Sequence, residues 1–123
     1  MRFKLPWPPT VNKMWRHVVM HGSPRTLLSR QGRAYRDDVA AAILAQVGPV
    51  NSKALRDCRV SVEIDAWMPD RRRRDIDNLS KAVLDSLQAA GVVADDSQVD
   101  VLTTRRCGFV RGGCLDVRIE DLS

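Results

Sequence analysis

At 123 residues the chain is long enough to bury one hydrophobic core and too short for separate binding and catalytic domains. Its 20 lysines and arginines exceed its 15 aspartates and glutamates, which gives a formal net charge of +5 and favours an anionic partner, nucleic acid before a membrane surface. No run approaches the roughly twenty apolar residues of a membrane-spanning helix. No apolar signal region follows Met1, so we expect a cytosolic protein.

The amino-terminal region predicts a short strand that leaves into a stiff, proline-rich loop over residues 5–10. The next segment, up to residues 22–25, mixes basic, polar and aromatic side chains, a composition suited to a mobile loop that faces DNA. Its candidate DNA contacts are Asn12, Lys13 and Arg16. An ordinary surface loop is equally compatible with this composition, and we expect Trp7 and Trp15 to pack into the core.

Two regular elements follow before the centre of the chain. Apolar residues recur every four positions between residues 29 and 47, which predicts a helix that ends at Gly48-Pro49. After a loop at residues 51–53, residues 59–68 alternate between apolar and polar side chains. This alternation predicts a half-buried strand.

Four consecutive arginines come after this strand and run into two aspartates separated by one residue. In an extended segment Asp75 and Asp77 would point to the same side, so their carboxylates could share a hard cation such as Mg²⁺. Guanidinium groups suit phosphate, and here they belong to Arg71, Arg72, Arg73 and Arg74. A basic strip for an anionic polymer beside a carboxylate pocket predicts a metal-dependent nuclease.

Simpler interpretations exist for both features. Either aspartate could be the N-cap of the helix that follows, and a run of arginines is more often a solvated loop than a nucleic-acid site. A second acidic pair, Asp95-Asp96, strengthens the metal hypothesis, because it follows a complete helical pattern that could bring it back beside the first pair. A double aspartate taken alone is usually a turn.

The helical pattern between the two acidic pairs extends from about Asp77 to Ala90 and stops at Gly91. Its buried stripe comprises Leu79, Val83, Leu87 and Ala90. Lys81 lies four residues after Asp77, so it could form a salt bridge there or act as a catalytic cation. The spacing alone leaves both roles open.

The carboxy-terminal third predicts a hairpin, with a strand over residues 99–109, a tight turn at residues 111–113 and alternation over residues 115–119. The three cysteines lack the spacing of a zinc site, and we expect them to be reduced and mostly buried. The elements together predict an α+β fold in a single compact domain, residues 1–123. Its small mixed sheet, with the C-terminal hairpin, would pack against two main helices.

Several motifs along the chain form a recognisable set: Pro8-Pro9 with Asn12, residues 68–79 with Lys81 and Asp85, and Gly91 followed by residues 95–99. Together they resemble the RusA family of Holliday junction resolvases, over nearly the whole chain. The resemblance implies a homodimeric, Mg²⁺-dependent endonuclease that makes paired cuts across a four-way DNA junction. It also implies action in the bacterial cytoplasm, with a bacterial, phage or prophage origin.

Carried over position by position, the resemblance implies that Asp75, Asp77 and Asp96 are the catalytic, metal-holding acids. It implies that Lys81 is the essential lysine and that Asn78 is a supporting residue that binds the DNA. We expect no membrane partner and no small-molecule cofactor beyond the metal. A DNA-binding module without chemistry is the main alternative, since it would need the arginines but not three acids. An Asp-x-Asp phosphotransferase or glycosyltransferase would normally use a far longer chain.

Overall fold

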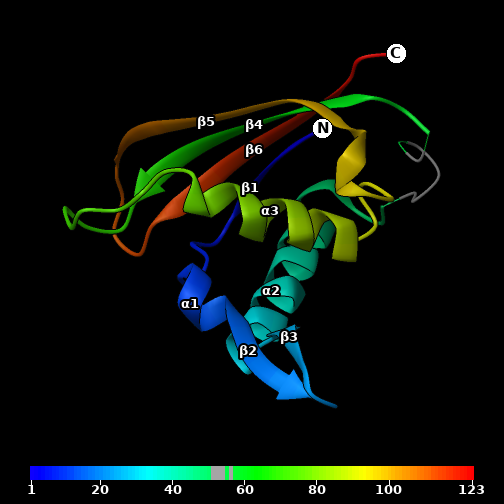
Figure 1. Ribbon diagram of the computed structural model, residues 1–123. Helices are drawn as coiled ribbons and strands as arrows, with labels where there is room; N and C mark the ends of the chain where they lie inside the picture. Colours follow the sequence, from blue (N-terminus) through cyan, green and yellow to red (C-terminus); the bar gives the residue numbers. More distant parts are fainter. Residues whose placement is uncertain (51–54, 56) are drawn as a thin grey trace.

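The computed structural model describes residues 1–50, 55 and 57–123, so the loop expected at residues 51–53 lies outside the described residues. Figure 1 labels the helices and strands that the described residues form. In chain order these are β1 (Arg2–Leu5), α1 (Val11–Met14), β2 (Trp15–Met20), β3 (Ser23–Leu28), α2 (Arg30–Val47), β4 (Val60–Met68), α3 (Asn78–Ala89), the short 3₁₀ helix η1 (Asp96–Gln98), β5 (Val99–Phe109) and β6 (Cys114–Asp121).

A four-stranded sheet with the order β1-β6-β4-β5 forms one layer of the molecule (Figure 1). β6 pairs antiparallel with β1 and β4, whereas β5 pairs parallel with β4, so the predicted mixed sheet is confirmed. The helices α2 and α3 lie on one face of this sheet (Figure 1). Their apolar sides and the inner faces of the strands form one hydrophobic core.

The strand predicted at residues 59–68 and both predicted main helices are confirmed. In β4 the even-numbered residues from Val60 to Met68 are buried, and the residues between them are half-buried or exposed. α2 begins where the Ser29 hydroxyl accepts a hydrogen bond from the Gly32 N–H at 3.0 Å, and it ends at Gly48, whose φ is 80°. α3 agrees with the prediction to within one residue at each end.

The predicted C-terminal hairpin is wrong, because β4 lies between β5 and β6. A turn does occur after Phe109, with Gly112 and Gly113 both at positive φ. It joins strands two positions apart, a gap of about 10 Å that four residues can span. The Val110 N–H donates to the Met68 carbonyl at 2.9 Å as the chain passes the end of β4. A turn signature does not specify whether the strands it joins are neighbours.

The predicted DNA-facing loop is also wrong as a description of residues 15–28, which form the two-stranded hairpin β2–β3. His21 and Gly22 have φ values of 52° and 76°, and Met20 pairs with Ser23, so a two-residue turn joins the strands. The sequence does not predict this hairpin, because the turn lacks the usual Asn-Gly or Asp-Gly pair. The prediction that both tryptophans of this region pack against the core is confirmed.

α1 is held tightly against the start of α2, which fixes the segment that carries Asn12 and Lys13. The Ser29 N–H donates to the Met14 carbonyl at 2.9 Å. A Cβ atom on Gly32 would lie 2.5 Å from that same carbonyl oxygen, closer than van der Waals contact allows. Glycine at position 32 therefore permits the close approach of these two elements.

The expectation that the cysteines are mostly buried is wrong. Cys107 is exposed, and Cys58 and Cys114 are half-buried. Cys107 lies on β5, an edge strand that is largely open to solvent. In the part of the chain that the structure describes, no helix combines the length and apolar character needed to cross a bilayer.

Candidate functional site

The loop between β4 and α3 carries the arginines and the first two aspartates, and Asp70 organises its first half. The Asp70 carboxylate accepts the Arg72 N–H at 2.9 Å and pairs with the Arg74 guanidinium through both of its oxygens. These contacts, first the Arg74 hydrogen bond and then the Arg72 N–H, lower the pKa of Asp70 to about 2. The loop is therefore held by a carboxylate that stays ionised near neutral pH.

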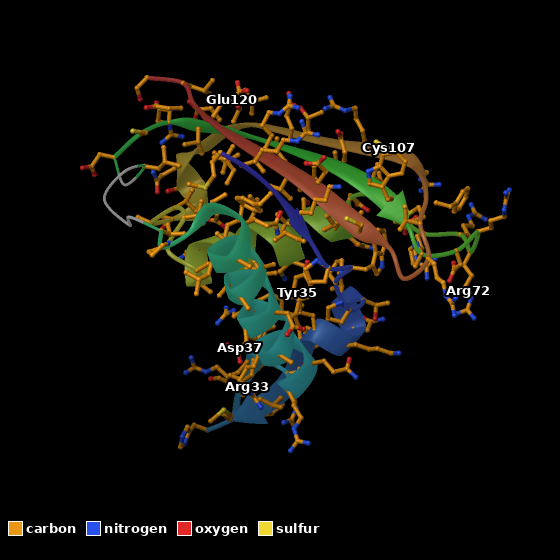
Figure 2. All side chains as sticks on the ribbon, turned by 180° about the vertical axis from the view of Figure 1, so that it is seen from behind. Arg33, Tyr35, Asp37, Arg72, Cys107 and Glu120 are labelled. Atoms are coloured by element: carbon orange, nitrogen blue, oxygen red, sulfur yellow. The ribbon has the colours of Figure 1, made fainter. Side chains whose placement is uncertain are left out.

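The four arginines divide into two kinds. Arg74 is paired with Asp70 and lies 5.9 Å from the centre of the Trp7 ring, while Arg71 lies 4.9 Å from the Phe109 ring. Arg71, Arg72 and Arg73 are all exposed, and the Arg72 side chain is 84% accessible although its Nε lies 3.9 Å from an Asp70 carboxylate oxygen. Figure 2 shows Arg72 at the end of the sheet where β4 enters this loop, well away from Arg33 and Asp37 on α2. Arg72 and Arg73 are thus the better placed to meet phosphates.

Asp75 and Asp77 are exposed, and among the described residues neither carboxylate has a hydrogen-bond or ion-pair partner. Asp77 occupies the N-cap position of α3, as the simpler interpretation allows. Its backbone is nevertheless helical, with φ −68° and ψ −24°, and its side chain makes no capping hydrogen bond. Asp77 therefore stands at the N-cap position without capping the helix, which leaves its carboxylate available to a ligand.

Lys81 lies one turn further along α3 and faces an aromatic ring. Its Nζ is 4.6 Å from the centre of the Trp15 ring, and in the described residues it has no ion-pair partner, so the possible salt bridge to Asp77 is not formed. Asp85, next on the same face, is held by Arg36 of α2 through hydrogen bonds of 2.6 and 2.7 Å. The Trp15 ring therefore holds the Lys81 ammonium group without neutralising its charge, so this group can still pair with an anion.

The second acidic pair consists of two residues with different surroundings. Asp95 caps η1 by accepting the Ser97 N–H at 2.9 Å, and this bond is the largest cause of its lowered pKa. Gln98 is buried and completes a capping box, since its side-chain oxygen accepts from the N–H groups of Ala94 (2.7 Å) and Asp95 (3.0 Å). Its amide also donates to the Cys58 carbonyl at 3.0 Å. Asp96 is left exposed at the start of η1.

Several of the candidate residues line two pockets that border α3. Asp75 and Asn78 line a pocket of about 250 Å³, whereas Lys81 and Asp96 line a second pocket of about 340 Å³. Asp77, between them in sequence, lines neither pocket. Within the described residues, no three acidic, histidine or cysteine side chains are close enough together to hold a metal ion. The structure thus places Asp75 and Asp96 in two different pockets and does not gather all three predicted acids.

The segment around α1 borders both pockets. Val11 lines the first pocket and Trp15 the second, with Asn12 and Lys13 exposed between them. Arg16 is exposed at the start of β2. The segment that carries the three candidate DNA contacts of the amino-terminal region therefore borders both pockets.

The residues that position the site, unlike those that form it, are not evident from the sequence. Asp70 stands out there only as part of the charged run, and the contact of Lys81 with Trp15 and the pairing of Asp85 with Arg36 join positions far apart in the chain. Gln98 does carry a local signal, because an aspartate followed three residues later by glutamine is a capping-box pattern.

Replacing Gln98 with methionine tests whether this residue stabilises the 3₁₀ helix η1, which carries Asp96. The change keeps a similar length but removes the acceptor of two backbone N–H groups and the donor to two backbone carbonyls, so we expect the free energy of unfolding to fall by roughly 2–5 kcal/mol. Urea denaturation measures the loss. Gln31→Met, at an exposed position of α2, is the matched control. Equal denaturation midpoints for the two variants would contradict the role assigned to Gln98.

Comparisons with known proteins bear on this arrangement. The family model described as "Endodeoxyribonuclease RusA" matches residues 6–120. "Crossover junction endodeoxyribonuclease rusA" of Enterobacteria phage 82 and the protein of the same name from Escherichia coli K12 are each 39% identical over 118 residues, which cover 96% of this chain and 92% of theirs. The Shigella sonnei relative is 38% identical over the same share. Both kinds of similarity extend across nearly the whole sequence, and the chain therefore belongs to the RusA family of endodeoxyribonucleases.

Proposed function

We propose that this protein is a crossover junction endodeoxyribonuclease that resolves Holliday junctions in DNA recombination and repair. Its family membership across residues 6–120 is the observation that carries this function. The site supports it, because carboxylates and a lysine line pockets that border α3, and exposed arginines belong to the loop that precedes this helix. A DNA-binding module without chemistry would have no use for carboxylates beside its phosphate contacts, since they repel the DNA.

We further infer that the nuclease uses Mg²⁺, held by Asp75, Asp77 and Asp96. Carboxylate oxygens are the donors that Mg²⁺ prefers, and this ion is usually held by only one or two carboxylates together with phosphate oxygens of the substrate. A preformed cage of three acids is therefore not required, and the donor chemistry of the exposed aspartates fits the ion. When bound at such a site, Mg²⁺ supplies Lewis-acid activation of water and neutralises charge on the phosphate.

The residues around these acids have separable roles in the proposed reaction. The ammonium group of Lys81, placed over Trp15, would stabilise negative charge that develops on the scissile phosphate. The amide of Asn78, one residue after Asp77, would hold the DNA strand beside the acids. Asp95 is occupied by its cap, which leaves Asp96 as the ligand of that pair.

Binding of the DNA would extend from the arginine loop to the α1 segment. Arg72 and Arg73 are exposed on the loop, and Asn12, Lys13 and Arg16 are exposed beside Val11 and Trp15, which line the two pockets. Arg71 and Arg74 would contribute charge while also ordering the loop through Phe109, Trp7 and Asp70. Residues 1–123 would work as one nuclease domain in the bacterial cytoplasm, encoded by the bacterium or a phage.

Two copies would act together, because a symmetric junction needs two cuts and a two-fold dimer supplies two sites related by the symmetry of the substrate. Sedimentation equilibrium tests this: the expected mass is about twice the 13.8 kDa of one chain. A protein that stays at the single-chain mass, free and on the junction, while still making paired symmetric cuts would contradict the dimer.

The exposed arginines should determine the salt dependence of DNA binding. Each lost phosphate contact lowers the slope of log affinity against log salt by about 0.9, so Arg72→Ala combined with Arg73→Ala should lower it by nearly two. Fluorescence anisotropy with a labelled junction in EDTA measures the slope. Arg30→Ala, an exposed residue of α2, should leave it unchanged. The same slope in the double variant and the wild type would show that Arg72 and Arg73 belong to a solvated loop that does not contact phosphates.

The neighbouring residues Asp95 and Asp96 provide a direct test of which aspartates are catalytic. With labelled four-way junction and Mg²⁺, Asp96→Asn should lose roughly a hundredfold or more in cleavage rate, because it removes a charged ligand. Asp95→Asn should cut at close to the wild-type rate, since asparagine caps as well as aspartate.

The controls separate the function from its alternative. The wild type should cut the junction but not a linear duplex of the same sequence, and EDTA should abolish cutting. Binding of the junction without any cleavage in Mg²⁺ would support the non-catalytic alternative. Wild-type rates in Asp96→Asn would remove Asp96 from the site.

A further inference from the structure

The pocket beside Asp75 has a composition that metal and phosphate binding do not explain. Its walls include the apolar side chains of Trp7, Pro8, Val11, Met68 and Leu79. The polar side chains of Arg73, Arg74, Asp75 and Asn78 also line it. A phosphate or a hydrated cation gains nothing from apolar walls, so this pocket requires a ligand with a flat or apolar surface of its own.

The aromatic wall is held in position before any ligand arrives. A Cβ atom on Gly113 would lie 2.9 Å from the Trp7 ring, so the turn between β5 and β6 packs directly against the indole. Arg74, fixed by Asp70, lies 5.9 Å from the ring centre. The Tyr35 hydroxyl donates to the Pro6 carbonyl at 2.8 Å and anchors the proline-rich segment that carries Trp7. The Trp7 side chain therefore loses little conformational freedom when a ligand stacks on it.

The size and position of the pocket restrict the ligand to something small and planar. At about 250 Å³ it is below the roughly 300–1,000 Å³ of sites for drug-sized molecules. It adjoins Asp75 and Arg73, residues assigned above to the metal and to phosphate. A DNA strand lying there presents nucleobases, which stack on aromatic rings whatever their sequence. At a branch point base stacking is already interrupted, so a base is turned outward at low cost.

We propose that this pocket receives one unpaired nucleobase of the junction, next to the phosphate that is cut. The inference rests on the proposed nuclease function and adds a specificity site to it. The base stacks on Trp7, and Asn78, which carries both a donor and an acceptor, hydrogen-bonds its edge. Capture of the base also fixes which phosphate of the strand lies at Asp75. The pocket thereby makes cleavage depend on the base at that position.

Removal of a base tests the proposal without any cleavage. A series of four-way junctions, each with one abasic residue at a successive position around the branch point, is titrated against the protein in EDTA. For the wild type we expect one position where loss of the base weakens binding about fivefold or more. For Trp7→Leu the intact junction and that abasic junction should bind within twofold of each other. Trp67→Leu, on the opposite face of β4 from the core, should behave as the wild type.

A second variant keeps the test decisive if Trp7→Leu does not fold. Val11→Phe fills the pocket from another wall and should also lose the sensitivity to the abasic residue. A wild type with no sensitive position, or an unchanged sensitivity in the folded pocket variants, would overturn the proposal. Either result would leave junction cleavage in Mg²⁺ intact, whereas a wild type that does not cut junctions would overturn the nuclease function itself.

Discussion

The parallel pairing of β4 with β5 is the constraint on which the arrangement of the site depends. Parallel neighbours cannot be joined by a tight turn, so the chain must cross back along the whole sheet, and α3 makes that crossing. The acids therefore come from the two ends of one connection, Asp75 and Asp77 before α3 and Asp96 after it. At 12 residues the helix is about 18 Å long. Asp96 nevertheless lines the same pocket as Lys81, one turn from Asp77, although the described residues hold no preformed three-carboxylate site.

Around this crossover, the positioning contacts are made by groups that the proposed reaction does not use. Asp70 holds the arginine loop, Gln98 and Asp95 hold η1, and Trp15 holds Lys81. Asp75 and Asp77, in contrast, are left without partners among the described residues, although a capping bond from Asp77 would stabilise α3 by about 1 kcal/mol. A helix start that forgoes its cap in this way is expected where a carboxylate serves a ligand instead.

Local pattern was enough to predict the elements that carry the site. The alternation in β4, the Ser29 and Gly48 ends of α2 and the apolar stripe of α3 all depend on neighbours in the sequence, and all are confirmed. The prediction of a C-terminal hairpin was wrong because strand adjacency depends on β4, which lies much earlier in the chain. The amino-terminal hairpin was missed because histidine rarely marks a tight turn. The site residues remain predictions supported by the family and by exposure, since their roles depend on a bound metal and DNA.

The proposed metal centre requires that Asp75, Asp77 and Asp96 bind together despite coming from opposite ends of α3. Paramagnetic Mn²⁺, titrated in place of Mg²⁺ into isotope-labelled protein bound to an uncut junction analogue, measures this directly, because it broadens the NMR signals of nearby amides. We expect broadening at residues 75–78 and 95–97 together, at the same Mn²⁺ concentration, and its loss from both segments in Asp77→Asn. Broadening confined to one segment, or none in either, would contradict a shared metal centre.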